Sequence, residues 1–369
     1  MYRGMWRRWG QVPRTCHYLT MARAHHHHSV PESYLRGWSH DRIHVMARRL
    51  LVPSPQYPEW GEQGIRSLTA YEHLYTSVSS GVESDELEIW LNKEFDSPGA
   101  EALSRVRQGA EPTPQDLQRL AFLGASLDVR TPVDYLESKS RWERDLPKMM
   151  AATLKRVRRQ LARAARLGQQ VQARAIPSAP ASLPVRVTIA RNPDGGGQIK
   201  AEITAGRELW LHKIRHVLSG IVNVLRTHEW RLMHPHTGLW WFTSDHPMMR
   251  LNFNSESDYD FGGGWGHPGS DLIFPLSPEL LLYTQVGRPL PDRNTFTEQE
   301  TRLIQRLLAR RAFRWIIARE GQLPSSELRH RTVDKRRFVE EESAWKAWHQ
   351  AQSDAETGQP RADPGAAGN

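Results

Sequence analysis

The chain contains 369 residues, of which 38% are hydrophobic and 25% are charged, and this composition excludes a disordered polymer and predicts a packed globular body. Its one cysteine, Cys16, excludes a disulfide framework and a thiolate metal site, and it indicates a reducing, cytoplasmic location. No apolar run approaches the roughly 20 residues that cross a bilayer, so no membrane segment is expected.

The formal net charge of +9 is concentrated in one segment, 148–174. This segment contains eight bases and no acid, and the remainder of the chain is close to balanced. The bases are Lys148, Lys155, Arg156, Arg158, Arg159, Arg163, Arg166 and Arg174. The high isoelectric point therefore describes a cationic patch, and DNA or RNA is the partner expected for such a patch.

The first part of the chain, 1–24, is predicted to be a disordered leader. The basic residues near its start are not followed by an apolar stretch, so it is not expected to act as a signal peptide. Translation can start at Met1 or at Met21. A single domain is expected over 25–325.

Capping residues mark the predicted helix starts. Ser84 begins a helix that extends to Arg107, with a break expected at Pro98-Gly99. Thr113 and Thr131 each precede a proline at the first helical position and an acid in the first turn. Thr297 begins a capping box, Thr-Glu-Gln-Glu, that predicts another helix.

Apolar alternation and turn residues predict the strands. Strands are expected at 43–52, at 185–190 paired with 198–204, at 228–233 paired with 239–243, at 272–276 and at 280–285, with a Gly-rich loop at 251–269. Further helices are expected at 135–173, 207–225 and 326–350, with a linker at 175–184 and a disordered tail at 351–369. The sequence thus predicts an α+β fold: a mainly helical single domain packed on a small, mostly antiparallel sheet, with a basic helical insertion at about 135–184.

The segment Trp240–Pro247 brings three aromatic residues directly against Ser244, Asp245 and His246. A buried strand that ends at this point holds a hydroxyl, a carboxylate and an imidazole at the rim of a core. Folds commonly place their chemistry at such a rim. The segment is therefore the predicted centre of a functional site.

Six motifs in this order resemble the bacterial family labelled only as domain of unknown function 4238. They are His28-Ser29-Val30-Pro31 with Tyr34-Leu35, the acidic helix around Glu86–Glu94, Arg130-Thr131-Pro132, Phe242–Pro247, Phe274–Pro278 and the helix from Thr297. The resemblance covers roughly 25–320 and implies that His28 belongs to a native motif rather than to a purification tag. The family usually has Asn where this chain has His246, and its label implies no activity.

A divalent metal site is the first hypothesis for these residues. His28, Glu94 and Asp245 supply the imidazole and carboxylate ligands that suit Mn, and carboxylates with water suit Mg. The same three residues and His246 are the candidate catalytic groups, since a bound metal can activate water and neutralise a phosphodiester. Arg130 is a candidate phosphate ligand. Lys155, Arg158 and Arg159 are candidate contacts to a nucleic-acid backbone.

Structural roles remain open for the same residues. His28 can cap a turn, Glu94 and Arg130 can form a buried ion pair between two helices, and Asp245 can form an Asx-turn. A Ser244–His246 hydrolase pair is disfavoured, because no Gly-x-Ser-x-Gly elbow is present. Gly262-Gly263-Gly264 lacks the following Lys-Ser/Thr of a phosphate loop and predicts a plain loop.

Two functions follow from these alternatives. The first is a metal-dependent hydrolase, a nuclease or a phosphoesterase, that acts on nucleic acid or another phosphate ester. The second is a non-enzymatic module that binds nucleic acid or protein through the basic helix 148–174. The hydrolase requires that His28 and Asp245 face one cavity.

Overall fold

The structure is a computed structural model, and it describes residues 26–79, 82–169, 185–191, 197–255, 258–321 and 329–357. The leader expected at 1–24 and the linker expected at 175–184 lie outside the described residues.

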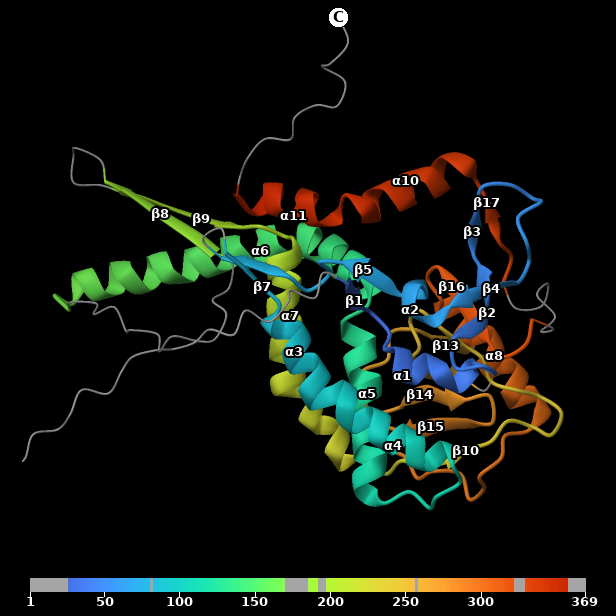
Figure 1. Ribbon diagram of the computed structural model, residues 1–369. Coiled ribbons are helices and arrows are strands. Elements are labelled where there is room, and N and C mark those ends of the chain that lie inside the picture. The colour runs from blue at the N-terminus through green and yellow to red at the C-terminus, as the bar shows by residue number, and fades with distance from the viewer. Residues whose placement is uncertain are drawn as a thin grey trace, which may run out of the picture.

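The described chain alternates irregularly between helices and strands (Figure 1). The helices are α1 (Glu32–Leu35), η1 (Arg36–Trp38), α2 (Ile65–Leu68), α3 (Glu86–Leu91), η2 (Asn92–Asp96), α4 (Ser97–Arg107), α5 (Pro114–Val129), α6 (Pro132–Arg166), α7 (Arg207–Ser219), η3 (Ile221–Thr227), α8 (Glu298–Arg311), α10 (Lys335–Lys346) and α11 (Trp348–Thr357). The strands are β1 (His26–His28), β2 (His44–Arg49), β3 (Leu51–Val52), β4 (Gly61–Gly64), β5 (Ala70–Glu72), β6 (Ser77–Ser79), β7 (Val82–Ser84), β8 (Val185–Arg191), β9 (Gly197–Ile203), β10 (Arg231–Met233), β11 (Thr243–Ser244), β12 (Met249–Ser255), β13 (Asp258–Asp260), β14 (Ser270–Ser277), β15 (Leu280–Gln285), β16 (Trp315–Ala318) and β17 (Thr332–Val333).

Two antiparallel sheets contain most of the strand residues that pair across long sequence separations. Five strands pair in the order β10-β15-β14-β12-β13, and four pair in the order β11-β16-β2-β4. Two-stranded ribbons, among them the parallel pair of β3 with β17, complete the strand content. The fold is mixed α+β. The expectation of a mainly helical domain on a small sheet is wrong, because the strands build two substantial sheets and several ribbons.

Sequence patterns underestimate the extent of the sheets in two places. The segment 251–269, expected to be a loop, contains most of β12 and all of β13, and its glycines, on which the loop expectation rested, lie outside both strands. The expected hairpin of 228–233 with 239–243 does not form. Instead β10 pairs with β15 and β11 pairs with β16. At the centre of the five-stranded sheet, β14 is buried at every position and lies between β12 and β15.

The helices α3, α4, α5 and α7 gather on one side of the sheets, while α6 extends away from the body of the domain (Figure 1). Gly99 lets α4 and α5 approach, since a Cβ at this position would lie 2.9 Å from the side chain of Leu123. The expected break near Pro98 takes the form of the π-helical turn η2 just before α4. No helix in the described ranges combines the length and the apolar character that crossing a membrane requires.

The predicted helix start at Thr113 and the predicted capping box at Thr297 are confirmed, and both form capping boxes. The Thr113 hydroxyl accepts the backbone N–H of Asp116 at the start of α5, and the Asp116 carboxylate accepts the backbone N–H of Thr113. Thr297 and Glu300 form the same reciprocal pair at the start of α8. These bonds satisfy backbone donors that the first helical turn leaves unpaired.

Tyr34 connects three of the motifs that carry the family resemblance. It lies wholly buried at the end of α1, and its ring stacks on Phe274 with centroids 5.2 Å apart. Its hydroxyl donates to the carbonyl oxygen of Pro275 at 2.7 Å and lies 2.7 Å from the hydroxyl of Thr243. One phenol therefore ties the N-terminal motif to β11 and to β14.

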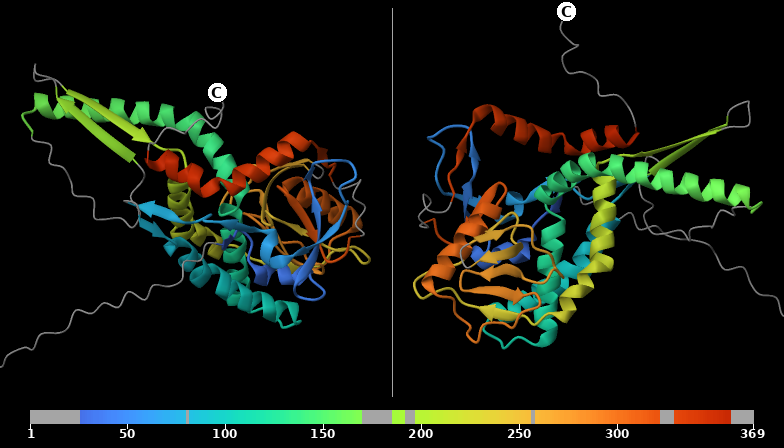
Figure 2. Two further views of the ribbon diagram at one scale, coloured as in Figure 1. Left: turned by 45° about the horizontal axis from the view of Figure 1, so that its top comes forward. Right: turned by 180° about the vertical axis from the view of Figure 1, so that it is seen from behind.

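The helices α10 and α11, named here the C-terminal strap, lie across one face of the domain (Figure 2). Trp348 anchors the strap, because it is buried against Tyr135 of α6, with ring centroids 4.7 Å apart. The helix expected at 326–350 is thus two helices, and residues 351–357, placed in the expected tail, belong to α11.

The tyrosine bridge yields a stability prediction. Tyr34→Phe leaves the Pro275 carbonyl without its donor in a dry core, so the free energy of unfolding is expected to fall by about 1–3 kcal/mol. Urea unfolding followed by tryptophan fluorescence measures this change. The control is Tyr57→Phe, which removes a phenol hydroxyl outside this network. An unchanged free energy of unfolding for Tyr34→Phe contradicts the role given to the hydroxyl.

Candidate functional site

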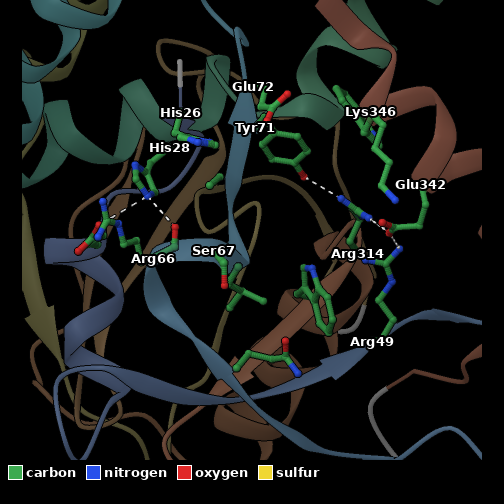
Figure 3. Close-up of a pocket in the computed structure, with 16 residues that line it drawn as sticks. His26, His28, Arg49, Arg66, Ser67, Tyr71, Glu72, Arg314, Glu342 and Lys346 are labelled. Atoms are coloured by element: carbon green, nitrogen blue, oxygen red, sulfur yellow. Dashed lines mark hydrogen bonds and ion pairs between the residues drawn. The ribbon is translucent and has the colours of Figure 1, made fainter. Parts of the chain in front are cut away.

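A cavity of about 1130 Å³ opens between the N-terminal strands and the C-terminal strap. Its walls come from β1, α2 and β5 on one side and from β2, β16 and α10 on the other (Figure 3). The lining residues are His26, His28, Glu32, Arg49, Gln63, Arg66, Ser67, Leu68, Ala70, Tyr71, Glu72, Arg314, Trp315, Glu342, Trp345 and Lys346. Its volume and its mixture of aromatic and charged walls are typical of a small-molecule site.

His28 lies on the wall of this cavity. Its Nε2 is 3.0 Å from the carbonyl oxygen of Arg66 and 3.6 Å from Oε1 of Glu32 (Figure 3). With acceptors on this side, Nε2 carries the proton and donates it. The pairing of β1 with β5 positions the residue, since His28 lies opposite Ala70.

Asp245 does not line the cavity. It is buried, and its carboxylate oxygens accept the backbone N–H groups of Phe313 at 2.9 Å and Arg314 at 2.7 Å. Burial raises the pKa of Asp245, and these backbone bonds oppose the rise. The carboxylate therefore fixes the turn that leads into β16, and this turn directs Arg314 to the cavity wall.

Glu94 and Arg130 are not brought together. Glu94 is exposed on η2 and lies 3.6 Å from the ammonium group of Lys93. Arg130 is wholly buried and forms a two-point contact with Asp96 at 2.8 and 3.0 Å. A buried ion pair does bridge the two helical segments, but its acid is Asp96. Arg130 is enclosed and does not line the cavity described above, so a phosphate in that cavity does not reach it.

His246 is buried beside the end of α5. Its Nε2 lies 3.5 Å from Oδ1 of Asp128 and 3.3 Å from Nη2 of Arg311. The hydroxyl of Ser244 accepts the backbone N–H of His246 rather than meeting its imidazole. The two side chains therefore form no nucleophile–base pair, in line with the sequence argument against one.

The three predicted metal ligands form no common group. Among the described residues, two other sets bring three ligand atoms within 4.8 Å of one another, and neither includes His28, Glu94 or Asp245. The sets are His73 with Glu83 and His349, and Asp41 with His44 and Glu62. The predicted His28–Glu94–Asp245 centre is thus not assembled, because its members belong to a cavity wall, an exposed helix and a buried turn.

The first of these sets does not suit a metal. The guanidinium of Arg207 donates to Nδ1 of His349 at 2.9 Å, so this nitrogen carries no proton. Nε2 of His349 then holds the proton and donates it to Glu83 at 3.0 Å. A metal-bound imidazole instead donates its second N–H to an acceptor, and a guanidinium cannot accept.

The second set lies near the surface, with Asp41 in the turn before β2, His44 at the start of β2 and Glu62 on β4. Asp41 accepts the backbone N–H groups of Ile43 and His44, and its other oxygen lies 2.7 Å from Nδ1 of His44. These bonds lower the pKa of Asp41 and raise the pKa of His44. Local turn formation accounts for the contact of Asp41 with His44, and the pairing of β2 with β4 brings Glu62 to 3.2 Å from the same Nδ1 of His44.

The second candidate surface is the basic half of α6, residues 148–166. At about 100° per residue, its bases fall within an arc of about 160°. The partly buried residues Met150, Leu154, Val157 and Ala164 fall on the opposite side. In both figures this half of the helix projects beyond the body of the domain, next to the β8–β9 ribbon (Figures 1 and 2). The basic arc therefore faces solvent.

Among the described residues, the bases of α6 from Lys155 to Arg166 have no acidic partner. Lys155, Arg158 and Arg159 are exposed, and none of them makes a side-chain hydrogen bond or ion pair within the described part of the chain. The first half of α6 differs, because Lys139 pairs with Glu143 and Arg144 with Asp145. One helix thus contains a charge-balanced half and an unbalanced half.

Sequence reasoning missed Arg49 and Arg314 on the cavity wall. A signal was present for Arg49, since Arg48-Arg49 interrupts an apolar strand, and a buried strand accepts arginine only with a partner. The acids that pair with Arg49 are Glu341 and Glu342, which lie almost three hundred residues further along the chain. The spacing of residues within a sequence motif therefore does not indicate them.

Comparison with known proteins gives one match. A family model described as Protein of unknown function (DUF4238) matches residues 26–322. The match confirms the resemblance drawn from the motifs and covers most of the chain. No curated protein and no solved structure matches the chain significantly.

Glu88 on α3 provides a pH-dependent prediction. Burial raises the pKa of Glu88 to about 7, although the charge of Arg130 opposes the rise. The folded protein therefore binds this proton more tightly than the unfolded chain, and stability falls as the pH rises from about 4.5 to about 7. Glu88→Gln is expected to raise the free energy of unfolding by about 2–3 kcal/mol near pH 8 and to leave it unchanged near pH 4.

Urea unfolding at a series of pH values measures this difference. Glu94→Gln, which removes an exposed carboxyl group, controls for the loss of one acid. A Glu88→Gln effect of equal size at both ends of the pH series contradicts the assignment of the titration to Glu88.

Proposed function

The chain belongs to the DUF4238 family, and since the description of that family names no activity, we propose from geometry alone that the protein binds nucleic acid through the basic half of α6. The observation that carries this proposal is the exposed arc of bases on a projecting helix without acidic partners in the described chain. Like charges so close together repel one another and are stabilised by a bound polyanion.

The dimensions of the helix suit a nucleic-acid backbone. Lys155 and Arg166 are separated by about 17 Å along the helix axis, at about 1.5 Å per residue. Duplex DNA presents one negative charge for about every 1.7 Å of its axis, and its major groove admits an α-helix. Several bases on this arc can therefore meet phosphates at the same time.

The apolar side of α6 favours this partner over a lipid surface. An interfacial helix inserts large apolar residues while its bases contact headgroups. In the basic half of α6, Leu154 and Val157 lie opposite the bases and are partly buried, whereas Met149 and Leu161 are exposed. The surface of residues 148–166 thus exposes seven bases and two large apolar side chains, and this excess of charge favours a polyanion over a lipid surface.

Metal-dependent hydrolysis is not part of the proposal. Its predicted ligands His28, Glu94 and Asp245 lie on separate features, and of these only His28 faces the cavity. The binding assay below nevertheless detects cleavage if Mg²⁺ or Mn²⁺ is added to the same samples. Degradation of the nucleic acid would restore the hydrolase hypothesis.

The test is a salt titration of binding to double-stranded and single-stranded DNA and RNA. The variant Lys155→Gln/Arg158→Gln/Arg159→Gln removes three bases of the arc. The slope of log K against log salt concentration is expected to become shallower by about 2.7 units, or about 0.9 for each lost phosphate contact on a duplex. Affinity at moderate salt is expected to fall by at least about tenfold.

A matched control removes three bases from the other half of the same helix. Lys139→Gln/Arg141→Gln/Arg144→Gln lowers the net charge equally, but these bases lie beside acids or a serine. This control is expected to keep an affinity and a salt slope close to those of the unmodified protein. Equal losses in the two triple variants would mean that net charge alone, and not the projecting arc, determines binding.

A further inference from the structure

Two arginines share one end of the cavity. Arg49 on β2 and Arg314 just before β16 are almost fully buried, with 3% and 8% exposure. Burial lowers the pKa of Arg49, and the nearby charge of Arg314 lowers it further. Two guanidinium groups in such proximity require a negative partner.

The negative partner comes from the C-terminal strap. Oε1 of Glu341 lies 2.6 Å from Nη2 of Arg49 and 2.8 Å from Nε of Arg314. Oε1 of Glu342 lies 2.9 Å from the same Nη2 of Arg49 and also pairs with Nη2 of Arg314 (Figure 3). Each carboxylate thus bridges both guanidinium groups through a single oxygen.

This arrangement leaves part of the donor capacity of the arginines unused. A guanidinium group presents a planar fork of N–H donors that matches two oxygens of one anion. Here each glutamate contributes one oxygen to both arginines. Glu341 and Glu342 are also partly exposed, at 20% and 36% of their side chains, so they can be displaced into water.

The two arginines and the two glutamates belong to different parts of the chain. Arg49 and Arg314 lie inside the matched region, residues 26–322, and Asp245 of the Phe242–Pro247 motif positions Arg314. Glu341 and Glu342 lie beyond that region. The family domain therefore builds the two-arginine site, and a segment outside the match fills it.

We propose that Arg49 and Arg314 form an anion site for a phosphate monoester, such as a nucleoside monophosphate, and that Glu341 and Glu342 occupy this site in place of the ligand. Two carboxylates carry two negative charges, and a phosphate monoester carries about 1.5 to 2 at neutral pH with three acceptor oxygens. A phosphate monoester therefore matches the charge of the two carboxylates that it displaces. Its oxygens can also accept hydrogen bonds from the guanidinium N–H groups that the glutamates leave unused.

The remainder of the cavity suits the body of such a ligand. Trp315, Trp345 and Tyr71 line its walls, and an aromatic lining of this kind can pack against a planar base. Its volume of about 1130 Å³ holds a nucleotide. The site is separate from α6, so its failure would leave the proposed nucleic-acid binding untouched.

The experiment measures binding of adenosine 5′-monophosphate and of inorganic phosphate by calorimetry at constant ionic strength. The variant Glu341→Gln/Glu342→Gln keeps the shape of the strap and removes its two charges. It is expected to bind adenosine 5′-monophosphate at least about tenfold more tightly than the unmodified protein. Adding Arg314→Gln to this variant is expected to abolish the gain.

Glu340→Gln is the matched control, because Glu340 is the preceding residue of α10 and pairs with Arg336 instead. It is expected to bind like the unmodified protein. Equal affinities of the unmodified protein, Glu340→Gln and a folded Glu341→Gln/Glu342→Gln would overturn the proposal.

A second measurement applies if the double variant does not fold. Hydrogen exchange of residues 335–346 in the unmodified protein is followed as phosphate replaces chloride at fixed ionic strength. Displacement of the two glutamates is expected to accelerate exchange in α10 and to leave exchange in α8 unchanged. Exchange in α10 that is the same in both anions would refute the displacement.

Discussion

The buried carboxylate of Asp245 is the constraint on which the cavity depends. It accepts the backbone N–H groups of Phe313 and Arg314, and so it holds the turn between α8 and β16 from the neighbouring strand β11. Because that turn fixes Arg314, a residue far along the chain reaches the cavity wall opposite His28. The acid that the sequence suggests as a metal ligand thus acts by placing a cation.

Buried arginines determine how distant parts of the chain are joined. Arg48, Arg49, Arg130, Arg207 and Arg314 are all nearly inaccessible, and each has a carboxylate oxygen within 2.8 Å. Glu341 and Glu356 of the C-terminal strap supply the acid for three of these five arginines. An uncompensated guanidinium inside a protein costs several kcal/mol, so the strap and the domain stabilise one another.

Sequence patterns predicted features that depend on a few adjacent residues. The helix start at Thr113 and the capping box at Thr297 depend on local hydrogen bonds, and the sequence locates both correctly. Strand pairing is not local, and the order β11-β16-β2-β4 joins segments from both ends of the chain. The same limit applies to the site. The exposure of Arg158 can be predicted from the polar residues around it in the sequence, whereas the partners of Arg49 are brought to it only by the assembled fold.

The contrast between enclosed and exposed cations separates structural from binding roles in this protein. Each of the five enclosed arginines named above has an acid of the same chain beside it, because a buried charge without a partner is costly. On the basic half of α6, solvent screens the charges, so the cations need no acid of the same chain. They therefore remain available to a partner. Arg49 and Arg314 combine the two situations, since they are enclosed and yet face partly exposed acids at a cavity. A cation pair of this kind can exchange one anion for another without unfolding the core around it.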